Sequence, residues 1–465
     1  MHKKLRNRRN FLKATAYSAL LGSGASAVNG KLSLIGSALA AQGDYANLTD
    51  YKALVCVFLY GGSDSFNLFI PNEPDKFNEY KQARGPLALN RESLLTDATN
   101  SVMFNPNLPD IRNIYDSGDI AIVRNVGNLI QPVNRSEYQS NPALIPSELF
   151  AHNHQQEQVL KSWASQPTGL VGAGWGGRMA DLLMEANGVD ALPPSYSMNN
   201  ANFFQPGNRS NPIAINPRTG PRLMDYLDAN TNTNSVDRDA TLQRLLNIPL
   251  VHRLEQYAKS SFVSAQDSSR ILSGIIDASP DLGPLDTDNK LAVQLRMVAR
   301  MISGREQLGM KRQLFFVGLG GWDTHDSQTP RLISLSQRLN AALADFHRAT
   351  IELGVQNQVT TFTSSDFGRS LTINGDGSDH GWGGHYLVMG GAVNGGKLYG
   401  DWPNYTLGGD DDVDDKGRII PSMSINQYGA ALGSWMGLST SDLLDVFPDL
   451  KNFETGWQSQ YGLFT

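Results

Sequence analysis

The chain has 465 residues, of which 40% are hydrophobic and 18% are charged, and this composition argues against disorder over most of its length. The formal net charge of -6 argues against a strongly basic nucleic-acid-binding protein. The single cysteine, Cys56, excludes an internal disulfide and a zinc site built from cysteines.

The first forty residues have the features of an export signal. Residues 1–13 contain basic residues and no acidic ones, and the uncharged stretch 14–27 that follows is rich in Ala, Ser and Gly. The segment Asn7-Arg8-Arg9-Asn10-Phe11-Leu12-Lys13 resembles the twin-arginine export motif, with Asn7 in place of the usual Ser or Thr. We therefore predict a signal peptide over 1–40, the twin-arginine translocase as partner during export, and delivery to the periplasm or the exterior.

Two features of this leader bear on the mature chain. Small residues that suit cleavage occur at Ala25-Ser26-Ala27 and at Ala38-Leu39-Ala40, and the second site lies nearer the first predicted strand. Residues 1–40 carry seven basic groups and no acidic ones, so their removal changes the net charge to -6 - 7 = -13. The leader is too short and too rich in small residues for a stable membrane span. The competing interpretation is a merely basic, amphipathic N-terminus.

Apolar runs predict the strands of a sheet. Residues 53–60 form an unbroken apolar run that ends at Gly61-Gly62, as a central strand buried on both faces does. Comparable runs follow at 119–124, 313–318, 358–363 and 386–389. Leucines at a helical period predict a helix over 329–353. This alternation of strands and helices favours a three-layer α/β sandwich.

Two regions interrupt the alternation. Residues 187–235 are rich in Asn, Pro, Gly and Ser, which predicts an irregular insertion. Residues 237–307 have a helical pattern that is broken near Pro280 and Pro284, which predicts an inserted helical subdomain. We expect 41–465 to form one large α/β domain that carries both insertions.

Polar side chains gather where the predicted strands end, which is where α/β sheets bind ligands. Those that follow the first, third and fourth strands, or precede the fifth, include Asp64, Ser65, Asp323, His325, Asp366, Arg369, His380 and His385. Carboxylates with imidazoles suit Zn, Mn or Fe, whereas an all-oxygen set would favour Mg or Ca. The pattern predicts a divalent-metal site of open identity. The alternative is that these acids cap helices and the histidines bond buried carbonyls.

Three further segments have two interpretations each. His152 and His154 belong either to a surface helix start or to a substrate pocket. Arg178 either holds an anionic substrate or forms a surface ion pair. The acidic run 410–415 fits a calcium loop poorly, because Lys416 and Met423 stand at ligand positions, so we interpret it as a solvated loop.

Several segments together resemble the bacterial domain-of-unknown-function family numbered 1501. They are Gly61–Asn67, Gly320–His325, Ser365–Arg369, Asp379–Gly381 with Gly390-Gly391, and Asp445–Pro448. The resemblance covers nearly the whole mature chain. That family looks related to the alkaline phosphatase and sulfatase superfamily, which implies a large α/β sandwich with metal ligands at its strand ends.

The resemblance also implies roles for single residues. Asp64 matches the first metal ligand of the superfamily, and Asp323 with His325 resembles its Asp and His pair at a tighter spacing. Asp366 occupies an Asp-His step in which Phe367 replaces the histidine. His380 or His385 matches the late histidine, and Ser65 is the candidate nucleophile.

These observations lead to two functional hypotheses. The first is an exported metal-dependent hydrolase of phosphate or sulfate esters. Its expected metal ligands are Asp64, Asp323, His325, Asp366 and His380. Its expected catalytic residues are Ser65, His154 and His385, and its expected substrate-binding residues are Arg178 and Arg369. The second is a non-catalytic secreted or surface protein that retains the fold and binds a glycan or another partner. The missing histidine and the unidentified nucleophile favour the second.

Overall fold

The computed structural model describes residues 45–166, 172–188, 192–221, 240–242, 244–249, 251–453 and 462–465. The predicted signal peptide, 1–40, lies outside them. Contacts divide the chain into a larger unit, Gly43–Arg222 with Ile271–Thr465, and a smaller one whose described residues lie between 240 and 270. Within the described part, no helix is both long and apolar enough to cross a bilayer.

A nine-stranded sheet forms the centre of the described part of the larger unit. Its strands are β1 Lys52–Tyr60, β5 Ile120–Gly127, β6 Ser195–Ser197, β7 Ile213–Ala214, β8 Arg312–Gly320, β9 Val359–Ser365, β12 Gly384–Met389, β13 Lys397–Tyr399 and β14 Met423–Ser424. They follow the order β13-β5-β12-β9-β1-β8-β6-β7, and β14 also pairs with β5. The described pairings are parallel except those of β12, which runs antiparallel to β5 and β9.

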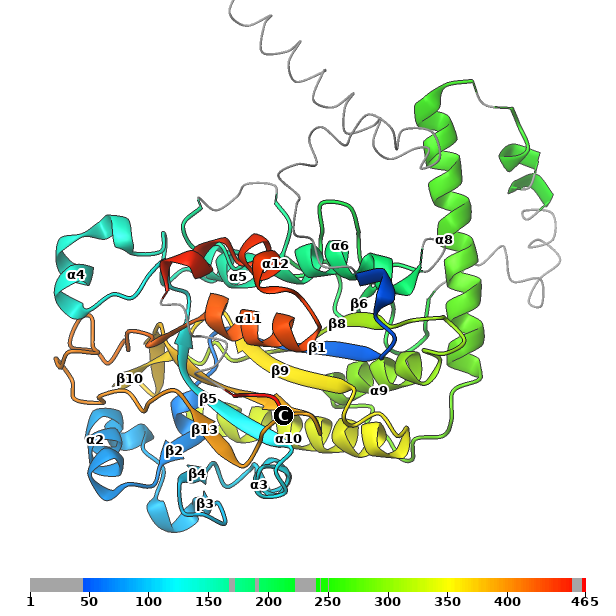
Figure 1. Ribbon diagram of the computed structural model, residues 1–465. Helices are drawn as coiled ribbons and strands as arrows, with labels where there is room; N and C mark the ends of the chain where they lie inside the picture. Colours follow the sequence, from blue (N-terminus) through cyan, green and yellow to red (C-terminus); the bar gives the residue numbers. More distant parts are fainter. Residues whose placement is uncertain are drawn as a thin grey trace, which may run out of the picture. The chain divides into compact units, whose positions relative to one another are not determined.

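Helices cover both faces of this sheet (Figure 1). They are α3 Pro109–Asp116, α5 His152–Lys161, α6 Trp175–Asn187, α9 Lys290–Ser303, α10 Gln328–Glu352, α11 Ile425–Trp435 and α12 Thr440–Val446. Val55 and Val57 of β1 pack in one core with α3, α9 and α10, whereas Cys56 and Phe58 pack in a second core with α5, α6, α11 and α12. Because alternate residues of a strand face opposite sides, a continuous apolar run fills both cores. The predicted three-layer α/β sandwich is confirmed.

The predicted elements are present with small shifts at their ends. Each of the five predicted strands corresponds to a strand of the central sheet, and the helix predicted over 329–353 is α10, Gln328–Glu352. Outside the three layers of the larger unit lie the helices α2 Pro74–Arg84 and α4 Arg135–Ser140. Two small sheets lie there as well. One contains β2 Phe69–Pro71, β4 Val102–Phe104 and β3 Leu95–Thr96, and the other contains β10 Arg369–Asn374 and β11 Gly377–His380.

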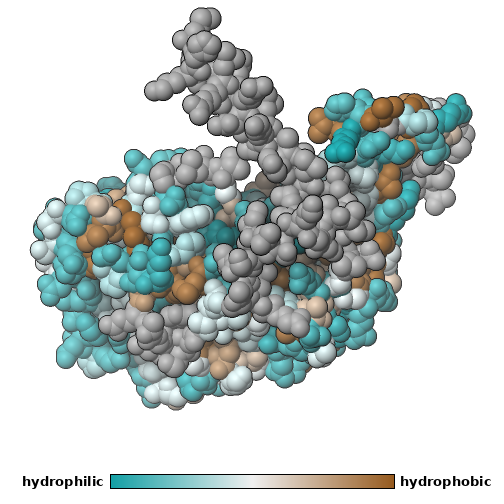
Figure 2. Space-filling model, turned by 45° about the horizontal axis from the view of Figure 1, so that its top comes forward, coloured by the Kyte–Doolittle hydropathy of each residue, from teal (hydrophilic) through white to brown (hydrophobic). Residues whose placement is uncertain are grey.

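The two regions predicted as insertions contain regular structure in their described parts. Within 187–235, the short strands β6 and β7 extend the sheet next to β8. Within 237–307 lie α9 and α8 Arg253–Asp277, and residues from both, including Leu272 of α8, belong to the buried core. On the face drawn in Figure 2, the described surface of the larger unit is mostly hydrophilic, with apolar side chains in small patches.

Candidate metal centre

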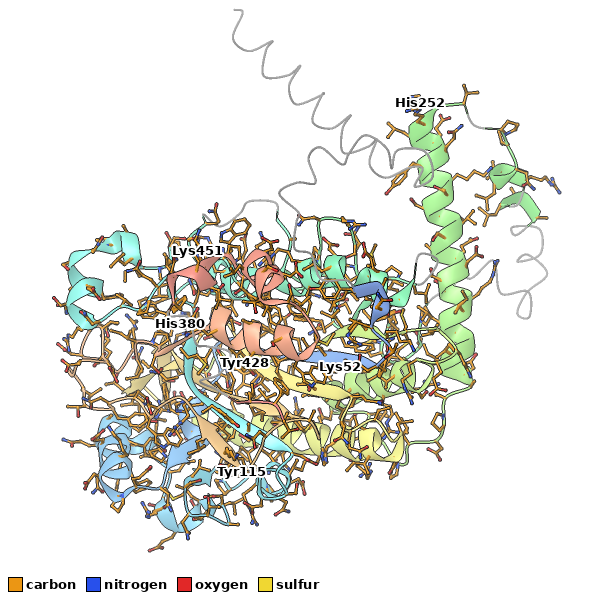
Figure 3. The ribbon with its side chains drawn as sticks, viewed as in Figure 1. Lys52, Tyr115, His252, His380, Tyr428 and Lys451 are labelled. Carbon is orange, nitrogen blue, oxygen red and sulfur yellow. The ribbon has the colours of Figure 1, made fainter. Side chains whose placement is uncertain are left out.

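The strand ends that carry the predicted acids meet at one edge of the sheet. β8 and β9 flank β1 and run parallel to it, so Asp323, Asp366 and Asp64 all follow carboxyl ends at the same edge. β12 is antiparallel, so its first residue lies at this edge too, and His380, the last residue of β11, stands four residues before it. In Figure 3, His380 lies toward the other end of the strands from Lys52, the first residue of β1.

Two glycines allow these loops to approach one another. Gly61 has φ +116°, and a Cβ built on it would lie 2.3 Å from the backbone nitrogen of Asp323. Gly62 has φ +80°, and a Cβ there would lie 2.5 Å from the ring of Phe367. A side chain at either position would therefore collide with the loop after β8 or the loop after β9.

His152, Asp323 and His380 form a group that could hold a metal ion. One ligand atom from each lies within 4.8 Å of the others. His152 Nε2 is 3.4 Å from Asp323 Oδ2, and His380 Nε2 is 3.3 Å from Asp323 Oδ1. His325 adjoins the group, because its Nε2 lies 3.0 Å from Asp323 Oδ1 and 2.9 Å from His380 Nε2.

Each of the three imidazoles turns its Nδ1 away from the group, toward an oxygen. His380 Nδ1 lies 2.7 Å from the carbonyl oxygen of Phe150, and His152 Nδ1 lies 2.6 Å from Asp366 Oδ2. His325 Nδ1 lies 3.5 Å from a carboxylate oxygen of Asp379. Carbonyl and carboxylate oxygens accept hydrogen bonds, so Nδ1 carries the hydrogen in the neutral rings of His152 and His380, whereas the longer contact of His325 does not fix its tautomer.

This tautomer leaves the lone pairs of the neutral His152 and His380 rings on Nε2. His325 Nε2 lies 2.9 Å from His380 Nε2, and both rings face a carboxylate oxygen of Asp323. Either a proton on His325 Nε2 or a cation among these atoms makes the arrangement attractive. Nitrogen and carboxylate donors whose opposite ring nitrogen is held by an oxygen are the usual ligand set of a divalent transition metal. The residues present therefore fit a metal ion.

The electrostatic surroundings favour the metal-binding protonation states of Asp323 and His380, whereas the hydrogen bond with Asp366 raises the pKa of His152. Burial raises the pKa of Asp323, but the hydrogen bond from Arg369 and the nearby His152 and His325 outweigh it, so this pKa lies below its usual value. Burial is the main cause of a lowered pKa at His380. An ionised Asp323 and a neutral His380 are the forms that bind a metal.

The group is open to solvent on one side. The side chains of Asp323 and His325 are 44% and 46% exposed, whereas those of His152 and His380 are 27% and 20% exposed. A site with three protein ligands and an accessible side is typical of catalytic rather than structural metal centres.

Asp64 and Asp366 lie in the interior beside this group, and each is 1% exposed. Asp64 forms an ion pair with Arg84 and accepts a hydrogen bond from Gln328 Nε2 at 2.5 Å. Asp366 faces His152 Nδ1 rather than its Nε2. The structure thus brings the predicted ligands Asp323, His325 and His380 together, and places Asp64 and Asp366 behind them.

Ser65 and His385 are joined by a hydrogen bond in the interior. Ser65 is 1% exposed, and its hydroxyl oxygen accepts the backbone N–H of His385 at 2.7 Å. His385 is 2% exposed, and its Nδ1 accepts the backbone N–H of Asn125 at 3.0 Å. Burial lowers the pKa of His385 to about 3, so its ring is neutral. Neither side chain belongs to the His152–Asp323–His380 group.

The remaining predicted residues have different surroundings. His154 is two residues beyond His152 in α5, and two helical residues are about 200° apart around the axis, so the two rings point in different directions. Arg178 is 9% exposed and donates hydrogen bonds to the backbone carbonyls of Ala173 and Val446, which ties α6 to the end of α12. Arg369 is fully buried and donates from Nη1 to Asp323 Oδ1 at 2.8 Å.

The sequence hypotheses did not include His152 among the ligands. Its ring enters the group from the start of α5, which follows β5 after a long connection that contains α4. The available signal was the pair of histidines in 150–158 after a strand of the sheet. That spacing alone does not indicate which of the two rings turns toward the strand ends.

Residues 51–416 match the protein family described as a protein of unknown function, DUF1501. The chain belongs to this family. The part matched to DUF1501 contains His152, Asp323 and His380, together with the adjoining His325. No curated protein matches the sequence.

Solved structures similar to this DUF1501 chain share little sequence with it. The lipoteichoic acid synthase LtaP from Listeria monocytogenes is 9% identical, covering 89% of this chain and 78% of that one, with a TM-score of 0.37. Ps i-CgsB is 8% identical, covering 87% of this chain and 77% of that one, with a TM-score of 0.36. Wild-type alkaline phosphatase PafA is 13% identical, covering 70% of this chain and 64% of that one, with a TM-score of 0.28. At such scores, function must be inferred from this chain's own side chains.

Proposed function

We propose that the chain is an exported metal-dependent hydrolase of phosphate or sulfate esters, with its metal ion held by His152, Asp323 and His380. One observation supports this most strongly: the Nε2 atoms of His152 and His380 converge on the carboxylate of Asp323 at an open edge of the sheet. Mixed imidazole and carboxylate donors favour Zn, Mn or Fe over Mg or Ca.

When bound, a divalent ion would polarise an ester oxygen and make a water molecule more acidic. The chain's own residues supply the rest of the chemistry. Arg369 fixes the orientation of Asp323 through their hydrogen bond. The half-exposed imidazole of His325 is placed to exchange a proton with water or with the leaving group. The Ser65 hydroxyl is buried and already accepts the backbone N–H of His385, which favours water as the nucleophile over Ser65.

The test is a screen of aryl phosphate and aryl sulfate esters with added Zn, Mn, Fe, Mg and Ca. Asp323→Asn keeps the size of the side chain and removes the charge shared by the three imidazoles, so we expect turnover to fall by about 100-fold or more. Asp326→Asn is the matched control, because Asp326 is 69% exposed and pairs with Arg331, and its turnover should stay close to wild type. Equal turnover in wild type and Asp323→Asn would contradict the proposal.

A non-catalytic role is the second candidate, and two observations favour it. Asp64 is neutralised by Arg84, and the ring of Phe367 lies 4.8 Å from that of His152 and 4.7 Å from that of His380, measured between centroids. On this alternative the fold binds a glycan or another partner. This alternative would be favoured if wild type binds a metal but shows only the trace turnover that Asp323→Asn also shows.

Export is the part of the proposal that rests on sequence alone. The paired Arg8-Arg9 with Phe11-Leu12-Lys13 supports the twin-arginine translocase as partner, and the periplasm or the exterior as destination.

A further inference from the structure

Asp366 lies behind His152 as seen from the metal group. Its Oδ2 faces His152 Nδ1 at 2.6 Å, and the same oxygen accepts Gln156 Nε2 at 2.9 Å and the backbone N–H of Gly61 at 3.2 Å. The two nitrogens of an imidazole lie on different edges of the ring. A metal ion on His152 Nε2 is therefore separated from this oxygen by the width of the ring.

We propose that Asp366 positions His152 for a single metal ion, and that neither Asp366 nor Asp64 binds that ion. The inference rests on the metal site of the proposed function but not on its catalysis. A carboxylate on Nδ1 fixes the tautomer of a metal-binding histidine, holds the ring in orientation and makes Nε2 more basic. Asp366 is buried, and one of its oxygens faces two side chains of α5 and the backbone N–H of Gly61, so it is itself held in place.

The surroundings of Asp64 explain why we expect one ion rather than two. Arg84, which is fully buried, pairs with Asp64 and is fixed by hydrogen bonds from Nη1 to the carbonyls of Ser370 at 2.8 Å and Leu371 at 3.3 Å. A second cation at Asp64 would lie against this buried guanidinium. Next to Asp366, Phe367 presents an apolar ring to the histidines.

Two buried oxygen atoms could bind a second metal ion, so the number of bound ions tests the inference. Oδ1 of Asp64 and Oδ1 of Asp366 are buried and have no hydrogen-bond partner among the described residues. A second ion would use these two oxygens. Within the described part, however, the groups of three or more metal-binding side chains include only His152, Asp323 and His380.

The experiment uses the full chain, stripped with a chelator and reloaded with Co²⁺. Metal content after dialysis is measured by mass spectrometry, and the visible spectrum of Co²⁺ reports its ligands. We expect one equivalent in wild type. Asp366→Asn should weaken Co²⁺ binding by about 10–100-fold while the absorption bands keep their positions, because the ligands themselves remain. Asp323→Asn should abolish or shift the bands, and Asp326→Asn should bind as wild type does.

Two equivalents in wild type would overturn the inference, as would an Asp366→Asn variant with unchanged affinity or with the altered bands of Asp323→Asn. If Asp366→Asn does not fold, nitrogen NMR of wild type labelled at histidine decides. One equivalent of Zn²⁺ should shift a histidine Nε2 whose Nδ1–H remains bonded to a carboxylate, and loss of that Nδ1–H would overturn the inference. A chain that binds one ion in this way but hydrolyses no ester would keep this inference and lose the proposed function.

Discussion

At the scale of single residues, the metal group depends on which nitrogen of each imidazole is free. The carbonyl of Phe150 and the carboxylate of Asp366 hold Nδ1 of His380 and His152, so Nε2 of both rings faces Asp323. Asp323, His325 and His380 could be predicted from the sequence because each stands beside a strand end. The pairing of Asp64 with Arg84 could not, because an isolated carboxylate at a strand end gives no signal of its partner.

The buried imidazole of His385 makes stability depend on pH. Its pKa is about 3 in the fold, against about 6.5 in an unfolded chain, so between these values the unfolded chain binds a proton that the folded chain excludes. Stability contributed by the neutral ring is therefore lost as pH falls below about 6.5, by about 2 kcal/mol between pH 7 and pH 5.

Replacing His385 with Asn tests this, because an amide oxygen can still accept the N–H of Asn125 and does not titrate. Unfolding by urea, measured with a chelator present, should show a smaller loss of stability between pH 7 and pH 5 in His385→Asn than in wild type. The same loss in both proteins would show that His385 is not the group responsible.

At the scale of elements, the site is made where three parallel strands and one antiparallel strand share an edge. Apolar runs predicted β1, β5, β8, β9 and β12, since buried strands need continuous apolar residues. The short strands β6 and β7 stand in an Asn- and Pro-rich region, where two or three residues give too little pattern to recognise. The orientation of α5 was equally hidden, because a long connection from β5 sets it.

Gly62 is the element-scale feature most open to test. Gly62→Ala would place a Cβ 2.5 Å from the ring of Phe367, at φ +80°, so we expect a loss of more than about 3 kcal/mol of stability and weaker Co²⁺ binding. Gly375→Ala is the matched control: it has φ +65° but nothing within 4 Å, and should lose only about 1–2 kcal/mol with metal binding unchanged. Denaturant titration of both variants makes the comparison, and equal losses would refute the role of close packing at Gly62.

At the scale of the whole molecule, residues 1–40 and the rest of the chain have opposite net charge. Seven basic groups in 1–40 precede a remainder of net charge -13, from -6 - 7. A remainder with this net negative charge is a poor partner for nucleic acid, which also carries negative charge. The sequence could predict this separation of charge because net charge depends only on composition, whereas the contacts of the metal site depend on the fold.

The export proposal predicts where a leader variant accumulates. Changing Arg8 and Arg9 to Lys keeps the charge but removes the paired guanidinium groups, so we expect the full-length chain to remain in the cytoplasm. Cell fractionation with immunodetection measures this, and Arg6→Lys serves as the control that should still be exported. Unchanged export of the double variant would argue for another route.

The central claim is that a metal ion binds where His152, His380 and Asp323 meet. Anomalous diffraction from crystals of the Zn²⁺-loaded protein, recorded on both sides of the zinc absorption edge, tests it most directly. We predict one strong peak at bonding distance from Nε2 of both histidines and from the carboxylate of Asp323. No peak at this position, or a peak bonded instead to Asp64 and Asp366, would contradict the account.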